Sequence, residues 1–230
     1  MNPLREFPSR GALMQAAADH LAENIRSGLQ TRGAACAALS GGTTPEPAYR
    51  LLAERALDWR NVTLALVDER FAPPTDPASN EGLLRRALAP ALSAGARVAP
   101  MWRDKSTPAQ AASAADTAYR SLQIDIALMG MGDDGHSASW FPQSTDLANA
   151  LDRANPRHVI AVDAPGTAGT SSRLTMTLAA ISQSAHALML ITGATKRSRF
   201  ETVIAEADLT QPLPALSAAL GDRLEIFWAA

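Results

Sequence analysis

The chain contains 230 residues, of which 47% are hydrophobic and 19% are charged, a composition typical of a folded globular domain and not of a disordered chain. Its 21 basic and 23 acidic residues give a formal net charge of −2, so no basic surface for nucleic acid is expected. The single cysteine, Cys36, cannot form an internal disulfide, and no apolar run approaches the ~20 residues that span a bilayer. Residues 1–5 lack the apolar core of a signal peptide, and we therefore expect a cytoplasmic protein without membrane contact.

The first predicted element is an amphipathic helix, and short strands then alternate with further helices. Apolar residues recur at four-residue steps from Leu13 to Leu29, which places them on one helix face. Helical spacing also predicts a helix over the alanine-rich residues 109–118. The predicted strands are the apolar runs at 34–39, 62–67, 124–129, 159–162, 187–191 and 224–228. Such runs suit strands buried on both faces, and their alternation with helices is typical of a parallel sheet.

These elements predict one α/β domain over residues 1–230. Its expected architecture is three-layer and Rossmann-like, with a mostly parallel open sheet flanked by helices. In an open sheet of this kind, ligands bind beyond the carboxyl ends of the strands. The segments that follow the predicted strands are therefore the places to look for functional residues.

Two glycines between hydroxyl residues follow the first predicted strand, where residues 40–45 read Ser-Gly-Gly-Thr-Thr-Pro. Glycines let an anion approach the backbone, and Pro45 is well placed to open a helix whose first N–H groups are free. One interpretation is a phosphate loop, and the other is a tight strand-to-helix turn with a threonine cap. No Gly-Lys-Ser/Thr follows, so the segment is not a Walker A loop.

Charged residues follow the second and fifth predicted strands. Asp68, Glu69 and Arg70 come directly after residues 62–67 and form either part of a site or a solvated charge cluster. Lys196, one of two lysines in the chain, follows residues 187–191 at a predicted helix start. A lysine there opposes the helix dipole, which favours a role with an anionic ligand over a role in helix stability.

Residues 130–135 spell Gly-x-Gly-x-x-Gly after the third predicted strand, yet they do not fit a dinucleotide site. Asp133 and Asp134 would repel a pyrophosphate, and residues 136–142 continue into no long apolar helix. We therefore exclude nicotinamide and flavin binding. The segment instead predicts an acid/base site with Asp133, Asp134 and His136, since histidine is suited to general-base catalysis near neutral pH.

Other patterns exclude further chemistries. His20, His158 and His186 lie away from the predicted strand-end rim and are expected to be structural or surface groups. No H-E-x-x-H or cysteine-rich spacing predicts a zinc site, and no G-x-S-x-G predicts a serine-hydrolase turn. We accordingly expect neither a metal nor a cofactor.

Four segments together resemble the 6-phosphogluconolactonase family: residues 40–45, 68–70, 130–142 and 173–175. The third segment is the most specific, and all four occur in the family's order. The resemblance implies an enzyme of the oxidative pentose phosphate pathway that hydrolyses 6-phospho-D-glucono-1,5-lactone to 6-phospho-D-gluconate. It also implies a fold related to that of glucosamine-6-phosphate deaminases. Trp140 stands where a smaller aliphatic residue is expected and is a candidate for reshaping the pocket wall.

The resemblance further implies a cradle for the substrate phosphate made of small residues after the first strand. Its members are Ser40, Gly41, Gly42 and Thr43. Arg173 and Lys196 would offset the phosphate charge through charge-assisted hydrogen bonds. Arg197 and Arg199 are rivals to Arg173 for this contact.

By the same resemblance, His136 would be the general base, which deprotonates a water for attack on the lactone carbonyl and then returns a proton to the leaving ring oxygen. Asp134 would orient the imidazole or hold substrate hydroxyls. Arg70 would bind the substrate or stabilise the developing oxyanion. The expected supporting residues are Asp68, Asn80 and Gly132.

Two alternatives stand beside lactone hydrolysis. A glucosamine-6-phosphate deaminase or isomerase would keep His136 but is expected to carry a glutamate shortly after it, and residues 137–147 contain none. A catalytically silent sugar-phosphate sensor would be expected to carry a DNA-binding domain or to have lost the histidine, and this sequence shows neither feature. The expected partner is a small phosphorylated sugar lactone, and the chain is expected to be a monomer or a homodimer.

Overall fold

The computed structural model describes residues 4–164 and 171–230. Within these ranges the main sheet has seven strands in the order β1-β10-β9-β6-β2-β3-β5, and neighbouring strands are parallel throughout. The strands of this sheet are β1 (Leu4–Glu6), β2 (Ala35–Leu39), β3 (Val62–Leu66), β5 (Arg97–Ala99), β6 (Ile126–Gly130), β9 (His186–Thr192) and β10 (Leu224–Ala229).

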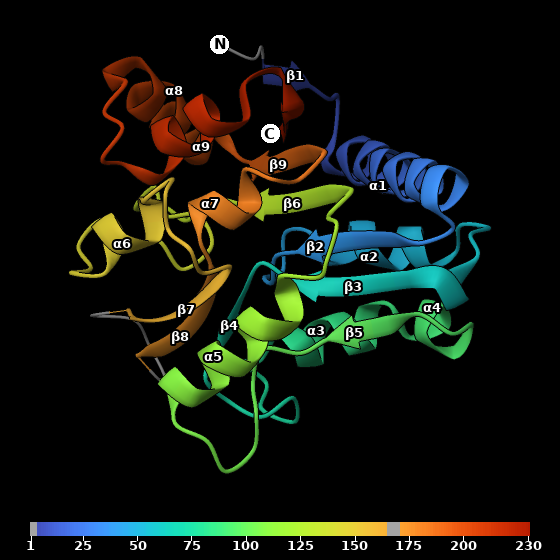
Figure 1. The fold of residues 1–230 in the computed structure, drawn as a ribbon. Helices are drawn as coiled ribbons and strands as arrows, with labels where there is room; N and C mark the ends of the chain where they lie inside the picture. Colours follow the sequence, from blue (N-terminus) through green and yellow to red (C-terminus); the bar gives the residue numbers. More distant parts are fainter. Residues whose placement is uncertain (1–3, 165–170) are drawn as a thin grey trace.

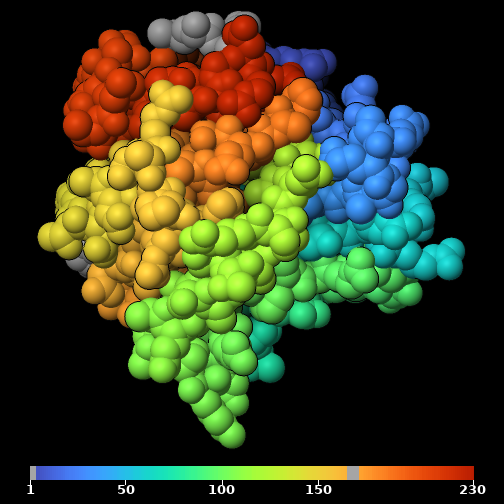
Figure 2. Space-filling view, viewed as in Figure 1, coloured from blue at the N-terminus to red at the C-terminus, as the bar shows by residue number. Residues whose placement is uncertain are grey.

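Helices cover both faces of the main sheet, which confirms the predicted fold class. They are α1 (Arg10–Arg32), α2 (Glu46–Ala53), α3 (Asn80–Ala87), α4 (Ala89–Ser93), α5 (Pro108–Tyr119), α6 (Leu147–Leu151), α7 (Leu178–Ile181), α8 (Ala194–Glu206) and α9 (Pro212–Leu220), with 3-10 turns at Trp59–Asn61 and Gly221–Arg223. In Figure 1, α7 lies in front of β6 and α2 lies behind β2. The loop between β5 and α5 projects from the lower end of the molecule (Figure 2). Within the described ranges, no helix combines the length and apolar character needed to cross a bilayer.

The core forms between the sheet and these helices. All five residues of β2 are buried, because helices exclude water from both of its faces. The predicted apolar stripe of α1 faces the sheet, with Leu13, Leu21 and Ile25 fully buried. Burial of a side chain of this size stabilises the fold by about 1.5–3 kcal/mol.

A smaller antiparallel sheet lies beside the carboxyl ends of the main strands (Figure 1). Its strands, in spatial order, are β4 (Asp68–Arg70), β8 (Ser172–Met176) and β7 (Val159–Asp163). The chain crosses between the sheets at Val67, whose N–H donates to Leu39 while its carbonyl accepts from Met176. The apolar run at 159–162 is therefore a strand, as predicted. The prediction that it belongs to the parallel sheet is wrong, since it pairs antiparallel with β8 in the smaller sheet.

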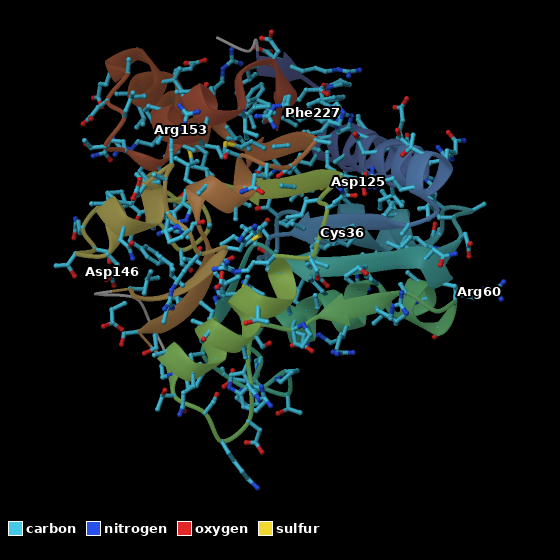
Figure 3. All side chains as sticks on the ribbon, in the orientation of Figure 1. Cys36, Arg60, Asp125, Asp146, Arg153 and Phe227 are labelled. Carbon is cyan, nitrogen blue, oxygen red and sulfur yellow. The ribbon has the colours of Figure 1, made fainter. Side chains whose placement is uncertain are left out.

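At the amino ends of the central strands, Asp125 lies near Cys36 (Figure 3) and its buried carboxylate pairs with the exposed Arg32. The carboxylate of Asp125 accepts hydrogen bonds from the Cys36 N–H at 2.8 Å and from the Arg32 guanidinium at 2.5 Å. This contact joins the end of α1 to β2 and to the start of β6. The Cys36 thiol is buried here, and burial raises its pKa to about 12.

Candidate active site

A cavity of about 210 Å³ lies at the carboxyl ends of β2, β6 and β9. Its floor is apolar and its rim is polar, which suits a small polar ligand held by a few oriented groups. The predicted site residues that line it are Gly41, Gly42, Asp68, Arg70, Asn80, Gly132, His136 and Lys196. The structure thus brings together residues from the segments after β2, β3, β6 and β9 and from the start of α3.

The segment after β2 forms the first wall. No described residue accepts a hydrogen bond from the backbone N–H groups of Gly41, Gly42, Thr43 or Thr44. These groups precede α2, and free N–H groups at a helix start form a site for an anion. The hydroxyl of Ser40 is buried beside them and has no hydrogen-bond partner among the described residues. This arrangement favours the phosphate loop over a simple turn.

Asn80, the first residue of α3, packs directly against Gly41. A Cβ atom on Gly41 would lie 1.8 Å from Asn80 Oδ1, so a side chain there would displace the asparagine. The Asn80 amide also donates to the Asp68 carbonyl at 2.8 Å and lies 3.3 Å from the Asp68 carboxylate. Asn80 therefore links the loop after β2 to strand β4.

Strand β4 supplies the second wall. Asp68 and Arg70 line the cavity, because alternate residues of a strand point to the same face. Asp68 accepts a hydrogen bond from the Ser139 hydroxyl at 2.6 Å, and the Arg70 guanidinium donates to the Ala78 carbonyl. The sequence did not single out Ser139, although its place three residues after His136 is a signal that it belongs to the same loop.

His136 and Asp134 form a pair at the third wall. His136 Nδ1 lies 2.5 Å from Asp134 Oδ1, and an ionised carboxylate only accepts, so Nδ1 carries the hydrogen and Nε2 is left as an acceptor. The hydrogen bond from His136 holds the pKa of Asp134 below its usual value. The imidazole also packs against the Phe141 ring, with 4.6 Å between centroids. The pair can accept a proton at Nε2 from a ligand in the cavity.

Gly132 makes room for this imidazole. A Cβ atom at position 132 would lie 2.2 Å from the ring of His136, a distance that no side chain tolerates. No helix follows this turn, since residues 131–146 contain none. This agrees with the exclusion of a dinucleotide fingerprint.

Lys196, in the first turn of α8, reaches the same cavity. Its Nζ donates to the Met131 carbonyl at 2.8 Å and lies 3.8 Å from the exposed carboxylate of Asp133. The lysine side chain is 27% exposed. Asp133 therefore faces Lys196, whereas Asp134 faces His136, which separates the two adjacent aspartates by their contacts.

The three candidate arginines have different surroundings. Arg197 is bound by Glu6 at 2.6 Å and Glu201 at 2.8 Å and lies over the Trp228 ring, so its charge is already matched. Arg199 donates to the Asp134 carbonyl at 3.3 Å. Arg173 is buried in β8 directly opposite Arg70, and burial together with the Arg70 charge lowers its pKa.

Not every predicted residue lines the cavity. Among the described residues, the predicted members outside its lining are Ser40, Thr43, Asp134 and Arg173. Trp140 is also outside it, contrary to the expectation that it shapes the wall. It is fully buried and its Nε1–H donates to the Met176 carbonyl at 2.8 Å. Lining residues that were not predicted as site residues include Thr44, Ala138 and Thr192. Thr44 and Ala138 lie within the segments 40–45 and 130–142, and Thr192 directly follows the predicted strand at 187–191.

Within residues 4–164 and 171–230, no three His, Cys, Asp or Glu side chains are grouped so that they could hold a metal ion. The polar groups of the cavity instead combine backbone N–H donors, a lysine, an arginine, an imidazole and the carboxylate of Asp68. Such a set can bind an anionic group at one end and transfer a proton at the other.

Comparisons with known proteins agree with this chemistry. The family described as glucosamine-6-phosphate isomerases/6-phosphogluconolactonase matches residues 8–228. The chain is 38% identical over 225 residues to the 6-phosphogluconolactonase of Mesorhizobium japonicum, covering 97% of this chain and 93% of that protein. It is 36% identical to that of Rhizobium meliloti, covering 97% of each. The crystal structure of a 6-phosphogluconolactonase from Shewanella baltica superposes with a TM-score of 0.91 at 29% identity, covering 100% of this chain and 98% of that one.

Proposed function

The chain belongs to the family of glucosamine-6-phosphate isomerases and 6-phosphogluconolactonases, and on that premise we propose that it hydrolyses 6-phospho-D-glucono-1,5-lactone to 6-phospho-D-gluconate. The observation that carries the proposal is His136, which is oriented by Asp134 and lines the same cavity as Lys196 and the glycines with free backbone N–H groups. Relatives named 6-phosphogluconolactonase at up to 38% identity support the same reaction. We propose the cytoplasm as its location, supported by a single cysteine in the chain.

In this proposal His136 is the general base. Nε2 takes a proton from a water molecule while the water oxygen bonds to the lactone carbonyl carbon. The ring C–O bond of the resulting tetrahedral intermediate then breaks, and the imidazolium returns the proton to the ring oxygen. The new carboxyl group releases its proton to solvent. A base of this kind supplies about 10²–10⁴-fold in rate, which is sufficient for a lactone that also opens without catalyst.

The remaining charged groups hold the substrate. The N–H groups of residues 41–44 and the ammonium of Lys196 would bind the phosphate. Arg173 would help to offset the negative charge of the phosphate. Arg70 would bind the substrate or stabilise the oxyanion that forms at the carbonyl. Asp134 fixes the imidazole through Nδ1. The proposed reaction uses neither a metal nor an organic cofactor.

The test is initial-rate hydrolysis of freshly generated 6-phosphogluconolactone against an enzyme-free blank. We expect wild-type enzyme to exceed the blank with or without a chelator, and His136→Ala to lose about 10²–10⁴-fold. His186→Ala is the matched control, because His186 is exposed at the amino end of β9. Full activity in His136→Ala would contradict the role of the base, and loss of wild-type activity with the chelator would contradict metal independence.

A second variant tests the phosphate contact. Lys196→Ala should raise KM for the phosphorylated lactone and spare any weak hydrolysis of unphosphorylated gluconolactone. An equal loss on both substrates would contradict the assignment of Lys196. If the wild-type chain binds the sugar phosphate without hydrolysing the lactone, deaminase activity on glucosamine 6-phosphate is the alternative to assay.

A further inference from the structure

A buried carboxylate with no direct place in the proposed reaction lies in the middle of β4. Glu69 is fully buried, and its two oxygens accept four hydrogen bonds. Oε1 accepts from the N–H groups of Arg70 and Asn80, both at 2.7 Å. Oε2 accepts from the Ser79 hydroxyl at 2.9 Å and from the Glu81 N–H at 2.7 Å. All four donors belong to β4 or to the start of α3.

This carboxylate is costly for the fold. Removing a charge from water is unfavourable even when it is well hydrogen-bonded, and burial raises the pKa of Glu69 to about 7 although all four donors oppose the rise. The start of α3 also has a cap of its own, since the Ser79 hydroxyl accepts from the Gly82 N–H at 3.1 Å. Helix capping alone therefore does not require an acid at position 69.

The donors on Oε1 identify what the carboxylate does. Arg70 and Asn80 both line the cavity, but they come from two elements joined by residues 71–79, which contain no helix or strand. The single oxygen Oε1 accepts hydrogen bonds from the backbone N–H groups of both residues and so fixes the distance between them. Asn80 in turn contacts Gly41 and Asp68. The position of one whole side of the cavity thus depends on Glu69.

We propose that Glu69 is a positioning residue that holds Arg70 and Asn80 together in the cavity wall through the shared oxygen Oε1. The inference rests on the proposed function, since the wall it organises is the one assigned to the sugar lactone. Glu69 itself contacts no substrate in this proposal. Its loss would move the wall and weaken binding of the sugar phosphate, while the His136–Asp134 pair on the other side would remain in place.

Glu69→Gln tests this inference, with Glu81→Gln as the matched control. The substituted amide keeps one acceptor oxygen but turns an NH₂ group toward two donors, which breaks the set of four contacts. Glu81 is also buried and follows Asn80 in α3, and its carboxylate pairs with Arg85 at 2.7 Å. Neither Glu81 nor Arg85 lines the cavity. Both variants change a buried glutamate to glutamine, so a general loss of stability is common to both.

We expect Glu69→Gln to lower kcat/KM for the phosphorylated lactone by about 10- to 100-fold, mainly through KM, because small displacements of binding groups have effects of this size. Equilibrium binding of 6-phosphogluconate should weaken in parallel. Glu81→Gln should change both quantities less than about twofold. Equal effects of the two substitutions, or wild-type constants in a folded Glu69→Gln, would overturn the inference.

If Glu69→Gln does not fold, Glu69→Asp is the variant that tests whether Glu69 positions the cavity wall. The shorter side chain keeps the charge but withdraws both oxygens by one methylene, so binding should weaken in the same direction by a smaller factor. Wild-type binding in folded Glu69→Asp would overturn the inference. A wild-type enzyme that does not hydrolyse the lactone would contradict the proposed function instead, and the binding measurement would still report on Glu69.

Discussion

At the scale of single residues, the contact between His136 and Asp134 has a consequence for catalysis. The hydrogen bond from His136 Nδ1 to Asp134 fixes the orientation of the ring and lowers the pKa of Asp134. Asp134→Asn removes the ionised acceptor. We expect kcat for the lactone, measured in initial-rate assays, to fall by up to about 100-fold, because the imidazole loses its orienting partner.

Asp133→Asn is the control for this prediction. It removes an identical charge from the adjacent residue, whose carboxylate lies 3.8 Å from Lys196 and is 83% exposed. Its kcat should stay close to that of the wild type, with only a small change in KM. A fall in kcat in Asp133→Asn as large as that in Asp134→Asn would show a general effect of charge and contradict the specific contact.

The sequence predicted the members of the site better than their individual contacts. His136, Lys196 and the glycines follow strands directly, so a strand prediction is enough to place them at one edge of the sheet. The choice among arginines was not predictable in this way. Arg197 directly follows Lys196 in sequence, yet it is held by Glu6 from the distant strand β1, a partner that local spacing does not reveal.

At the scale of elements, Asp116 joins α5 to the smaller sheet. Its Oδ1 accepts from the N–H groups of His158 at 2.5 Å and Val159 at 3.3 Å, while Oδ2 pairs with Arg120 at 3.0 Å. Burial alone would raise the pKa of Asp116, but these donors outweigh it and the pKa is lowered. We expect Asp116→Ala to reduce the free energy of unfolding by about 1–3 kcal/mol at neutral pH, since the N–H groups at the start of β7 lose their acceptor.

The pH dependence of that loss follows from the direction of the shift. A carboxyl group with a lowered folded pKa stabilises the protein above its unfolded pKa of about 3.9 and loses the contribution as pH falls further. The difference between wild type and Asp116→Ala in urea denaturation should therefore stay constant from pH 8 to 5 and shrink in stronger acid. Asp104→Ala, in an exposed loop where the carboxylate caps only the next N–H, should show no such difference.

The elements themselves were largely predictable, but not all of their partners were. Apolar runs at 34–39, 62–67 and 187–191 became β2, β3 and β9 with ends shifted by at most one residue. The run at 159–162 carried the same signal and joined the other sheet. An apolar run indicates that a segment is a buried strand. Which strand it pairs with depends on long-range contacts, such as the crossing between the sheets at Val67. The segment 68–70 is too short and too charged to be predicted as a strand from its sequence. It forms strand β4 because it pairs with β8.

At the scale of the whole molecule, His20 couples stability to pH. It belongs to α1 and faces β10, with Nε2 3.3 Å from Glu225 Oε1 and its ring 5.7 Å from the Phe227 ring. Burial lowers its pKa in the folded protein, assisted by His186 and opposed by Glu225. Between the unfolded value of about 6.5 and the lower folded value, the unfolded chain binds a proton that the folded chain does not, so acidification through this range destabilises the fold.

His20→Gln removes this titration. We expect the variant to lose less unfolding free energy than the wild type between pH 7 and 5.5, measured by urea denaturation at fixed ionic strength. Its stability at pH 7 should be lower by up to about 1.5 kcal/mol, because contacts with Phe227 are reduced. An identical pH slope in the two proteins would contradict the role of His20.

The arrangement of β1 and β10 also bears on how the protein is made. Leu4 pairs with Ile226 and Glu6 with Trp228, so β1 adds to the sheet through a strand encoded some 220 residues later. A ribosome delivers the amino-terminal part of a chain first, and earlier segments begin to fold before later ones emerge. Helix α1 can collapse onto β2 early in translation, but β1 has no partner in the sheet until β10 has left the ribosome. Strand β1 is thus made before the other strands described here, yet it can join the sheet only after all of them have been synthesised.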